Sequence, residues 1–132
     1  MNEIDVPITL FYAGFLGLLG VALANQVLWA RINAKRLADW KPETTFRVQG
    51  NFIEYVPLAI ALLYLVEVSG VSETMVHVLG ATLVISRFAH AWGLSRNPGA
   101  TYARLFGAQM TFLLLAIMSF TGLYYYLVPR LF

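Results

Sequence analysis

Four long apolar stretches, separated by short polar ones, dominate the chain. A helix that crosses a lipid bilayer needs about 20 mostly apolar residues, and each stretch is near this length or longer. The pattern predicts four membrane-spanning helices at about residues 6–30, 49–68, 75–93 and 102–128. Because the links between them are short, neighbouring helices should run antiparallel. We therefore expect an all-α integral membrane protein, a four-helix antiparallel bundle forming one domain over residues 1–132.

The composition strengthens the membrane prediction and narrows the chemistry. Of the 132 residues, 59% are hydrophobic and only 12% are charged, against about 25% charged in an average soluble domain. The net charge of +2 is too small to suggest nucleic acid as a partner. Cysteine is absent, which excludes disulfides, thiolate metal sites and a cysteine nucleophile.

Basic residues gather at one side of the predicted bundle. The first and third links and the helix ends beside them carry eight of the nine: Arg31, Lys35, Arg36, Lys41, Arg47, Arg87, Arg96 and Arg104. Only Arg130 falls at the other side. Basic residues near membrane spans favour the cytoplasmic side. We therefore expect these links to face the cytoplasm, both termini to face away from it, and the protein to reside in a bacterial inner membrane.

The segment RVQGNFIEYVP, residues 47–57, places polar side chains where the second apolar stretch begins. At 100° per residue, Asn51 and Glu54 lie within about 40° of Arg47 on a helix, with Tyr55 at the edge of the stripe. A charge exposed to lipid costs several kcal/mol, so the stripe should face protein or a water-filled cavity. A structural alternative is an ion pair of Glu54 with Arg47 or Arg87 that fastens helices together.

Four arginines, one on each helix, are predicted at one level of the bundle: Arg31, Arg47, Arg87 and Arg104. Glu54 is the carboxylate at this level that could pair with them. His90 shares a helix face with Arg87. The excess of guanidinium groups predicts an anionic ligand held by charge-assisted bonds, such as one with two carboxylates and an ammonium that Glu54 would bind. Alternatively, the arginines extend to lipid headgroups, which would account for Arg31 and Arg104.

Two other classes of helical protein, metal-binding bundles and small multidrug exporters, fit the sequence less well. His77 and His90 are thirteen residues apart, about 20 Å along a helix, so they cannot share a metal ion. The Glu-x-x-His motif of di-iron helical bundles is absent, and no metal is expected. Small multidrug exporters are also four-helix proteins, but they typically carry an acidic residue in the first span. Residues 6–30 contain none.

The polar segment resembles the signature of the MAPEG family, the membrane-associated proteins of eicosanoid and glutathione metabolism. That signature is Arg, three residues, Asn, two residues, Glu-Tyr, one residue and Pro, matched by Arg47, Asn51, Glu54, Tyr55 and Pro57. The likeness extends over essentially the whole chain. It implies a homotrimer of four-helix subunits that binds glutathione, as a co-substrate, between neighbouring subunits near the cytoplasmic side.

The resemblance also implies roles for individual residues. It implies that glutathione would be bound by Arg31, Arg47, Gln49, Asn51, Glu54 and Tyr55. Arg87 and His90 join this predicted binding set because they share one face at the same level of the bundle. Arg104 would stabilise the glutathione thiolate, which then attacks a hydrophobic electrophile or reduces a lipid hydroperoxide that arrives from the membrane lipids. This sequence has His90 and Leu94 where conjugating relatives often have tyrosines, and Ile32 where leukotriene synthase has a second arginine. These departures keep a non-catalytic, lipid- or partner-binding member of the family as an alternative.

Overall fold

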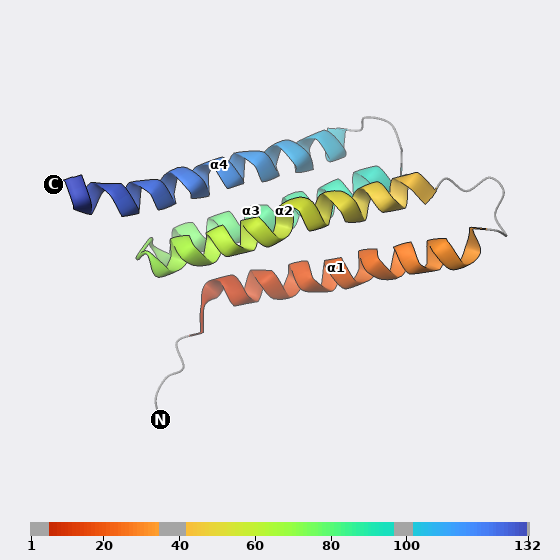
Figure 1. Ribbon diagram of the computed structural model, residues 1–132, viewed down its shortest axis with the longest axis horizontal. Helices are drawn as coiled ribbons and strands as arrows, with labels where there is room; N and C mark the ends of the chain where they lie inside the picture. The colour runs from red at the N-terminus through yellow and green to blue at the C-terminus, as the bar shows by residue number, and fades with distance from the viewer. Residues whose placement is uncertain (1–5, 35–41, 97–101, 132) are drawn as a thin grey trace, which may run out of the picture.

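Four helices make up nearly all of the part of the chain that the structure describes. The structure is a computed structural model, and it describes residues 6–34, 42–96 and 102–131. The helices are α1 (Ile8–Asn33), α2 (Pro42–Val68), α3 (Glu73–Arg96) and α4 (Tyr102–Leu131) (Figure 1). The predicted all-α membrane bundle is confirmed. Lys35, Arg36 and Lys41 lie outside the described residues, as do the side chains of Leu94 and Arg96.

The largest difference from the predicted boundaries is at the start of α2. The helix begins at Pro42, seven residues before the predicted start at residue 49. Hydropathy marks only the apolar part of a helix, and residues 42–48 are mostly polar. Proline suits a first helical position because its missing N–H would have no partner there, and Glu43 complements the helix dipole in the first turn. The polar stripe therefore lies well inside α2.

Three helices, α1, α2 and α4, are long and apolar enough to cross a membrane on their own. The fourth, α3, has sufficient length, but it carries buried polar side chains such as Ser86, Arg87 and His90. It contacts each of the other three helices. Because protein covers so much of its surface, α3 needs less apolar surface toward lipid than the others.

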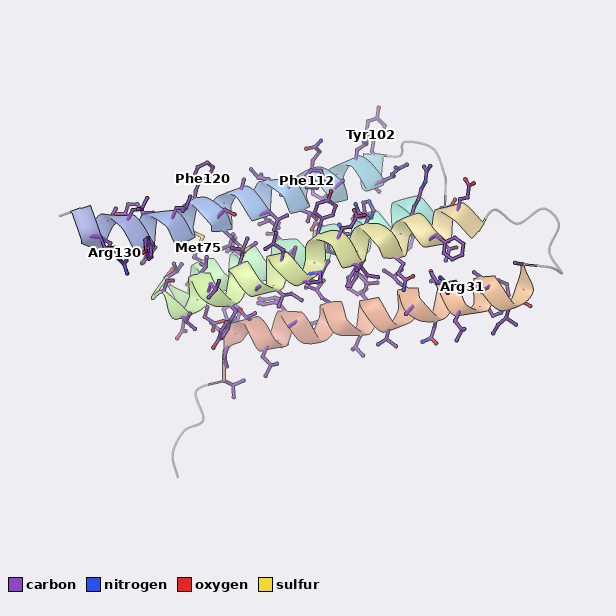
Figure 2. All side chains as sticks on the ribbon, in the orientation of Figure 1. Arg31, Met75, Tyr102, Phe112, Phe120 and Arg130 are labelled. Atoms are coloured by element: carbon purple, nitrogen blue, oxygen red, sulfur yellow. The ribbon has the colours of Figure 1, made fainter. Side chains whose placement is uncertain are left out.

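The helices α2 and α3 form the middle of the bundle, with α1 and α4 on opposite sides of them (Figure 1). Among the described residues, α1 and α4 make no contact with each other. The chain runs antiparallel from helix to helix, so α1 and α3 finish at the end where α2 and α4 begin. We call this the arginine end. Arg31 and Tyr102 mark it in Figure 2, whereas Met75 and Arg130 mark the far end.

Apolar side chains fill the centre of the bundle and also cover its outside. Each helix contributes a fully buried residue to the core: Leu16, Leu63, Leu83 and Met118. Large apolar residues, including Leu18 on α1 and Phe120 on α4, are exposed. A surface as apolar as the interior is what a lipid environment favours, since lipid tails solvate such side chains.

At the far end, a carboxylate of α2 caps the start of α1. The first turn of α1 follows Pro7 and has no side-chain cap of its own. Glu67 instead accepts hydrogen bonds from the backbone N–H groups of Ile8, at 2.5 Å, and Thr9, at 2.9 Å. A negative charge at a helix N-terminus satisfies free donors and complements the helix dipole. Glu67 therefore fixes α1 to α2.

A second contact fixes α1 to α3 at the same end. The Tyr12 hydroxyl lies 2.8 Å from Nδ1 of His77. The Tyr12 ring packs directly on Gly80, where an added Cβ would overlap the ring atoms. Only a glycine permits this close approach of α1 and α3.

Candidate functional site

A cavity of about 500 Å³ opens at the arginine end, between α2, α3 and α4. Its lining comes from Phe46, Arg47, Gly50, Asn51 and Glu54 of α2, His90 of α3 and Arg104 of α4. Five of these seven residues are ones that the sequence singles out. The polar stripe of α2 therefore lines a cavity, and the volume falls within the range of small-molecule sites.

The contribution of α2 follows from helical spacing. Positions 46, 47, 50, 51 and 54 recur every three or four residues and so share one face. Sequence reasoning found Arg47, Asn51 and Glu54 but missed Phe46 and Gly50, although the same spacing includes both. The space beside Gly50 is open, since an added Cβ would meet no atom within 4 Å. Gly50 therefore leaves room in the polar face.

The position of Arg104 relative to His90 depends on a close contact between α3 and α4. At Gly107, an added Cβ would lie 2.5 Å from the backbone oxygen of Ser86 and 2.7 Å from Cβ of His90. Glycine lets α4 lie directly against α3 at this point. Arg104 stands one turn before Gly107 and is thereby brought to the same cavity as His90.

Arg87, Asn51 and Thr111 form a polar cluster next to the cavity. Arg87 is only 2% exposed. Its Nη2 donates to Oδ1 of Asn51 at 2.8 Å, and its Nη1 makes a longer contact of 3.4 Å with the hydroxyl of Thr111. The guanidinium carbon lies 5.9 Å from the ring centroid of Phe52, within the range of a cation–π contact. Thr111 in turn donates to the backbone oxygen of Gly107 at 2.8 Å.

These contacts contradict the structural alternative of an ion pair. Both hydrogen-bond partners of Arg87 are neutral, and within the described ranges Glu54 forms no ion pair with Arg47 or Arg87. Glu54 instead lines the cavity. Arg87 was predicted to bind the ligand directly, but it is not among the residues that line this cavity; it donates instead to Asn51, which does line it.

Two buried nitrogen atoms beside the cavity have no hydrogen-bond partner: Nε of Arg87 and Nδ1 of His90. Buried polar atoms in proteins are almost always hydrogen-bonded. His90 lines the cavity, although its Nδ1 is enclosed, so the imidazole contributes a polar side chain to the cavity wall. The arrangement therefore offers hydrogen-bonding groups from α3 as well as from α2 and α4.

Three other predicted residues do not line the cavity within this chain. Arg31, labelled in Figure 2, is exposed, and its guanidinium carbon lies 5.6 Å from the ring centroid of Phe46, which lines the cavity. Tyr55 packs edge-on against Phe112 of α4, with ring centroids 5.0 Å apart. Gln49 is half-buried on α2. Their roles in binding stay predictions.

Two further cavities differ from this one in chemistry. One, of about 310 Å³, lies between α1 and α3 and includes Leu19, Phe88 and Trp92. The other, of about 440 Å³, lies between α3 and α4 toward the far end and includes Met75 and Phe120. Over the described residues, neither has a charged group in its lining. In the same part of the chain, no three His, Asp or Glu side chains gather as a metal site would require.

Comparison with known proteins places the chain in a family. The model of the MAPEG family matches residues 9–124, which include most of every helix and the whole cavity lining. The chain belongs to the MAPEG family. The resemblance based on the signature segment is thereby confirmed.

Curated relatives of this MAPEG protein include the inner membrane protein YecN from two strains of Escherichia coli. Each is 32% identical to the chain over 88 residues, which is 63% of this chain and 62% of the relative. The chain thus spans less than two thirds of the length of these relatives. Their name places them in the inner membrane and states no activity. The protein is accordingly a membrane protein of the MAPEG family.

Proposed function

We propose that the protein is a glutathione-dependent transferase or peroxidase that acts on hydrophobic substrates in a bacterial inner membrane. The observation that carries the proposal is the lining of the arginine-end cavity. Two guanidinium groups, a carboxylate, an amide and an imidazole meet there, in a protein of a family that includes glutathione transferases. This set of groups is complementary to a tripeptide with two carboxylates and one ammonium.

Each charged group of the cavity has a counterpart on glutathione. Arg47 offers a planar pair of donors that suits a carboxylate. Glu54 is an acceptor for the ammonium, and Asn51 lies between these two residues on the same helix face. The binding of glutathione would thus use the three signature residues that line the cavity.

Arg104 is proposed to activate the thiol. A free thiol has a pKa of about 8.5 and is mostly protonated at neutral pH, and a nearby cation lowers that pKa. Each unit by which the pKa of the thiol falls corresponds to about 1.36 kcal/mol of preferential stabilisation of the thiolate. The thiolate sulfur then forms a bond to an electrophilic carbon of a substrate that arrives laterally from the bilayer, either displacing a leaving group or adding to a double bond that takes up a proton. With a lipid hydroperoxide, the thiolate instead attacks the O–O bond, which breaks to give the lipid alcohol and a sulfenic acid, and a second glutathione converts this acid to glutathione disulfide and water. The protein itself need not supply a nucleophile.

The proposed assembly is a homotrimer with the site close to a neighbouring subunit. The family resemblance supports this assembly, and the position of Arg31 and Tyr55 outside the lining leaves both available to a second copy. The excess of basic residues at the arginine end supports a cytoplasmic position for the cavity, with both termini on the other side. Native mass measurement in mild detergent should give a trimer, and a clear monomer or dimer would contradict a shared site.

The proposed activation is tested by ultraviolet difference titration of the detergent-solubilised protein with glutathione at neutral pH. The wild type should give a saturable thiolate signal. Arg104→Ala should lose that signal while retaining most of the binding measured by equilibrium dialysis. Arg130→Ala, on the same helix but at the far end, is the matched control and should behave like the wild type. A thiolate signal that survives in Arg104→Ala would refute the assigned role.

A second candidate function is non-catalytic binding of a lipid or a partner, in which the site holds glutathione without activating it. The observation that favours it is His90, which occupies a position where conjugating relatives often have a tyrosine. The same titration separates the two functions: a non-catalytic protein would bind glutathione in dialysis without generating thiolate. In either case Glu54→Gln should weaken glutathione binding, because the ammonium loses its charged partner, and unchanged affinity would contradict the proposed pose.

A further inference from the structure

The contact between Arg87 and Asn51 fixes which way the Asn51 amide points. A guanidinium group has five N–H donors and no acceptor. The atom of Asn51 that faces Arg87 at 2.8 Å must therefore be the amide oxygen. The amide NH2 is left on the other side of the group, and Asn51 lines the cavity. No other hydrogen bond of the Asn51 side chain occurs among the described residues.

We propose that Arg87 is a positioning residue, which acts through Asn51 to present a fixed hydrogen-bond donor to the ligand. This inference rests on the proposed function and deepens it, since it names how one group of the glutathione site is set. With Arg87 in place, Asn51 donates to a carbonyl or carboxylate oxygen of the tripeptide. A ligand that offers an N–H at this point would leave two donors facing each other and would be rejected.

The burial of Arg87 supports a role beyond packing. A buried charge is costly unless it is paired, and replacing such a group by an apolar residue of similar size is often neutral or stabilising. Arg87 is 2% exposed, and its hydrogen-bond partners, Asn51 and Thr111, are neutral. A neutral glutamine could hold the same place, but its amide can donate or accept. Only a group that always donates keeps the Asn51 oxygen turned inward.

The other groups at the cavity make a fixed donor useful. Glu54, one turn further along α2, accepts hydrogen bonds, whereas Arg47, one turn earlier, donates them. An amide free to flip between them would bind an N–H or an oxygen equally well. With its orientation fixed, Asn51 extends the donor surface of Arg47 toward Glu54. The α2 face then distinguishes the acceptor part of the ligand from its ammonium.

The test is a double-mutant cycle on glutathione affinity, measured by equilibrium dialysis in mild detergent. Arg87→Gln should weaken binding by about tenfold in the protein with Asn51, as expected for loss of a hydrogen bond to a charged group. In the Asn51→Ala background, the same substitution should change affinity by less than about twofold, because no amide remains to be oriented. Arg87→Lys, which also only donates, should restore most of the lost affinity.

A second variant keeps the inference testable if Arg87→Gln does not fold. Asn51→Asp retains an oxygen toward Arg87 and gives the buried guanidinium a counterion, so its melting temperature should equal or exceed that of the wild type. The same substitution replaces the donor facing the ligand by a negatively charged acceptor. Glutathione affinity should therefore fall by at least about tenfold while stability is maintained.

The outcomes separate this inference from the proposed function. If the wild type does not bind glutathione, the proposed function fails and the inference fails with it. If the wild type binds but Arg87→Gln weakens binding equally in both backgrounds, Arg87 is merely structural and the inference alone is overturned. Wild-type affinity in Asn51→Asp would likewise overturn it. Coupled losses in the cycle, rescue by Arg87→Lys and a stable Asn51→Asp that fails to bind would support it.

Discussion

Replacing Gly107 by alanine tests whether the α3–α4 contact sets the geometry of the cavity. An added Cβ would lie 2.5 Å from the Ser86 oxygen, whereas ordinary contacts begin near 3.4 Å. The difference means that α4 must move away by about 0.9 Å at this point. The atoms in the way belong to backbone or to Cβ of His90, so no side chain can rotate aside to relieve the overlap.

The energetic cost follows from two opposing effects. Overpacking of this kind costs roughly 1–3 kcal/mol, and alanine recovers up to about 1 kcal/mol through its higher helix propensity. We expect a net loss of about 1–2 kcal/mol, because the rigid contact places the cost in the upper part of its range. The displacement should also break the contact of Arg87 with Thr111, which at 3.4 Å is already near the limit of a hydrogen bond.

Gly122→Ala is the matched control on the same helix. An added Cβ at Gly122 meets no atom within 4 Å, so this substitution should be neutral or slightly stabilising. Thermal unfolding in detergent, followed by circular dichroism, should show a lower midpoint for Gly107→Ala than for both the wild type and Gly122→Ala. The glutathione thiolate signal should weaken in parallel. Equal midpoints and equal signals for the two variants would refute the close contact as the determinant of this geometry.

Further expectations concern the cavity and the far end. Gly50→Leu should abolish glutathione binding with little loss of stability, because its side chain would enter the open space of the cavity. Gly14→Leu, at another open position, is the control and should bind glutathione in dialysis like the wild type. Full binding by Gly50→Leu would exclude this cavity as the site. Glu67→Gln should cost about 1–2 kcal/mol, because the helix α1 loses a charged cap. Glu73→Gln, in the exposed first turn of α3, should change the unfolding midpoint much less, and the capping role is contradicted if both variants melt alike.

The sequence was sufficient to predict the fold class and the polar face of α2. Apolar stretches of span length identify helices directly, and the spacing of Arg47, Asn51 and Glu54 places them on one face without reference to a partner. The start of α2 could not be found in this way, because hydropathy does not detect a polar helical extension. The contact of Arg87 with Asn51 could not be found from the sequence either, because it depends on how α3 packs against α2.

What the sequence could not provide is the contact between helices. Thr111 can contact Arg87 only because α4 lies against α3. That close approach depends in turn on Gly107, which meets the backbone of Ser86. Glycine and threonine are common in membrane helices, so neither residue signals such a contact by itself. The orientation of the Asn51 amide has the same origin, since it follows from the distance between two helices and not from any local pattern.

The separation of α1 from α4 shapes how the protein meets its surroundings. A four-helix bundle whose outer helices touched would have a compact, nearly square cross-section, but here the described helices spread on both sides of a central pair (Figure 1). Such an elongated cross-section has a longer perimeter and so contacts more annular lipid. Association of copies would replace lipid contacts rather than water contacts, so packing and lipid release, not the hydrophobic effect, would drive it. The choice of detergent or lipid should therefore decide whether copies associated in the proposed trimer remain together during purification.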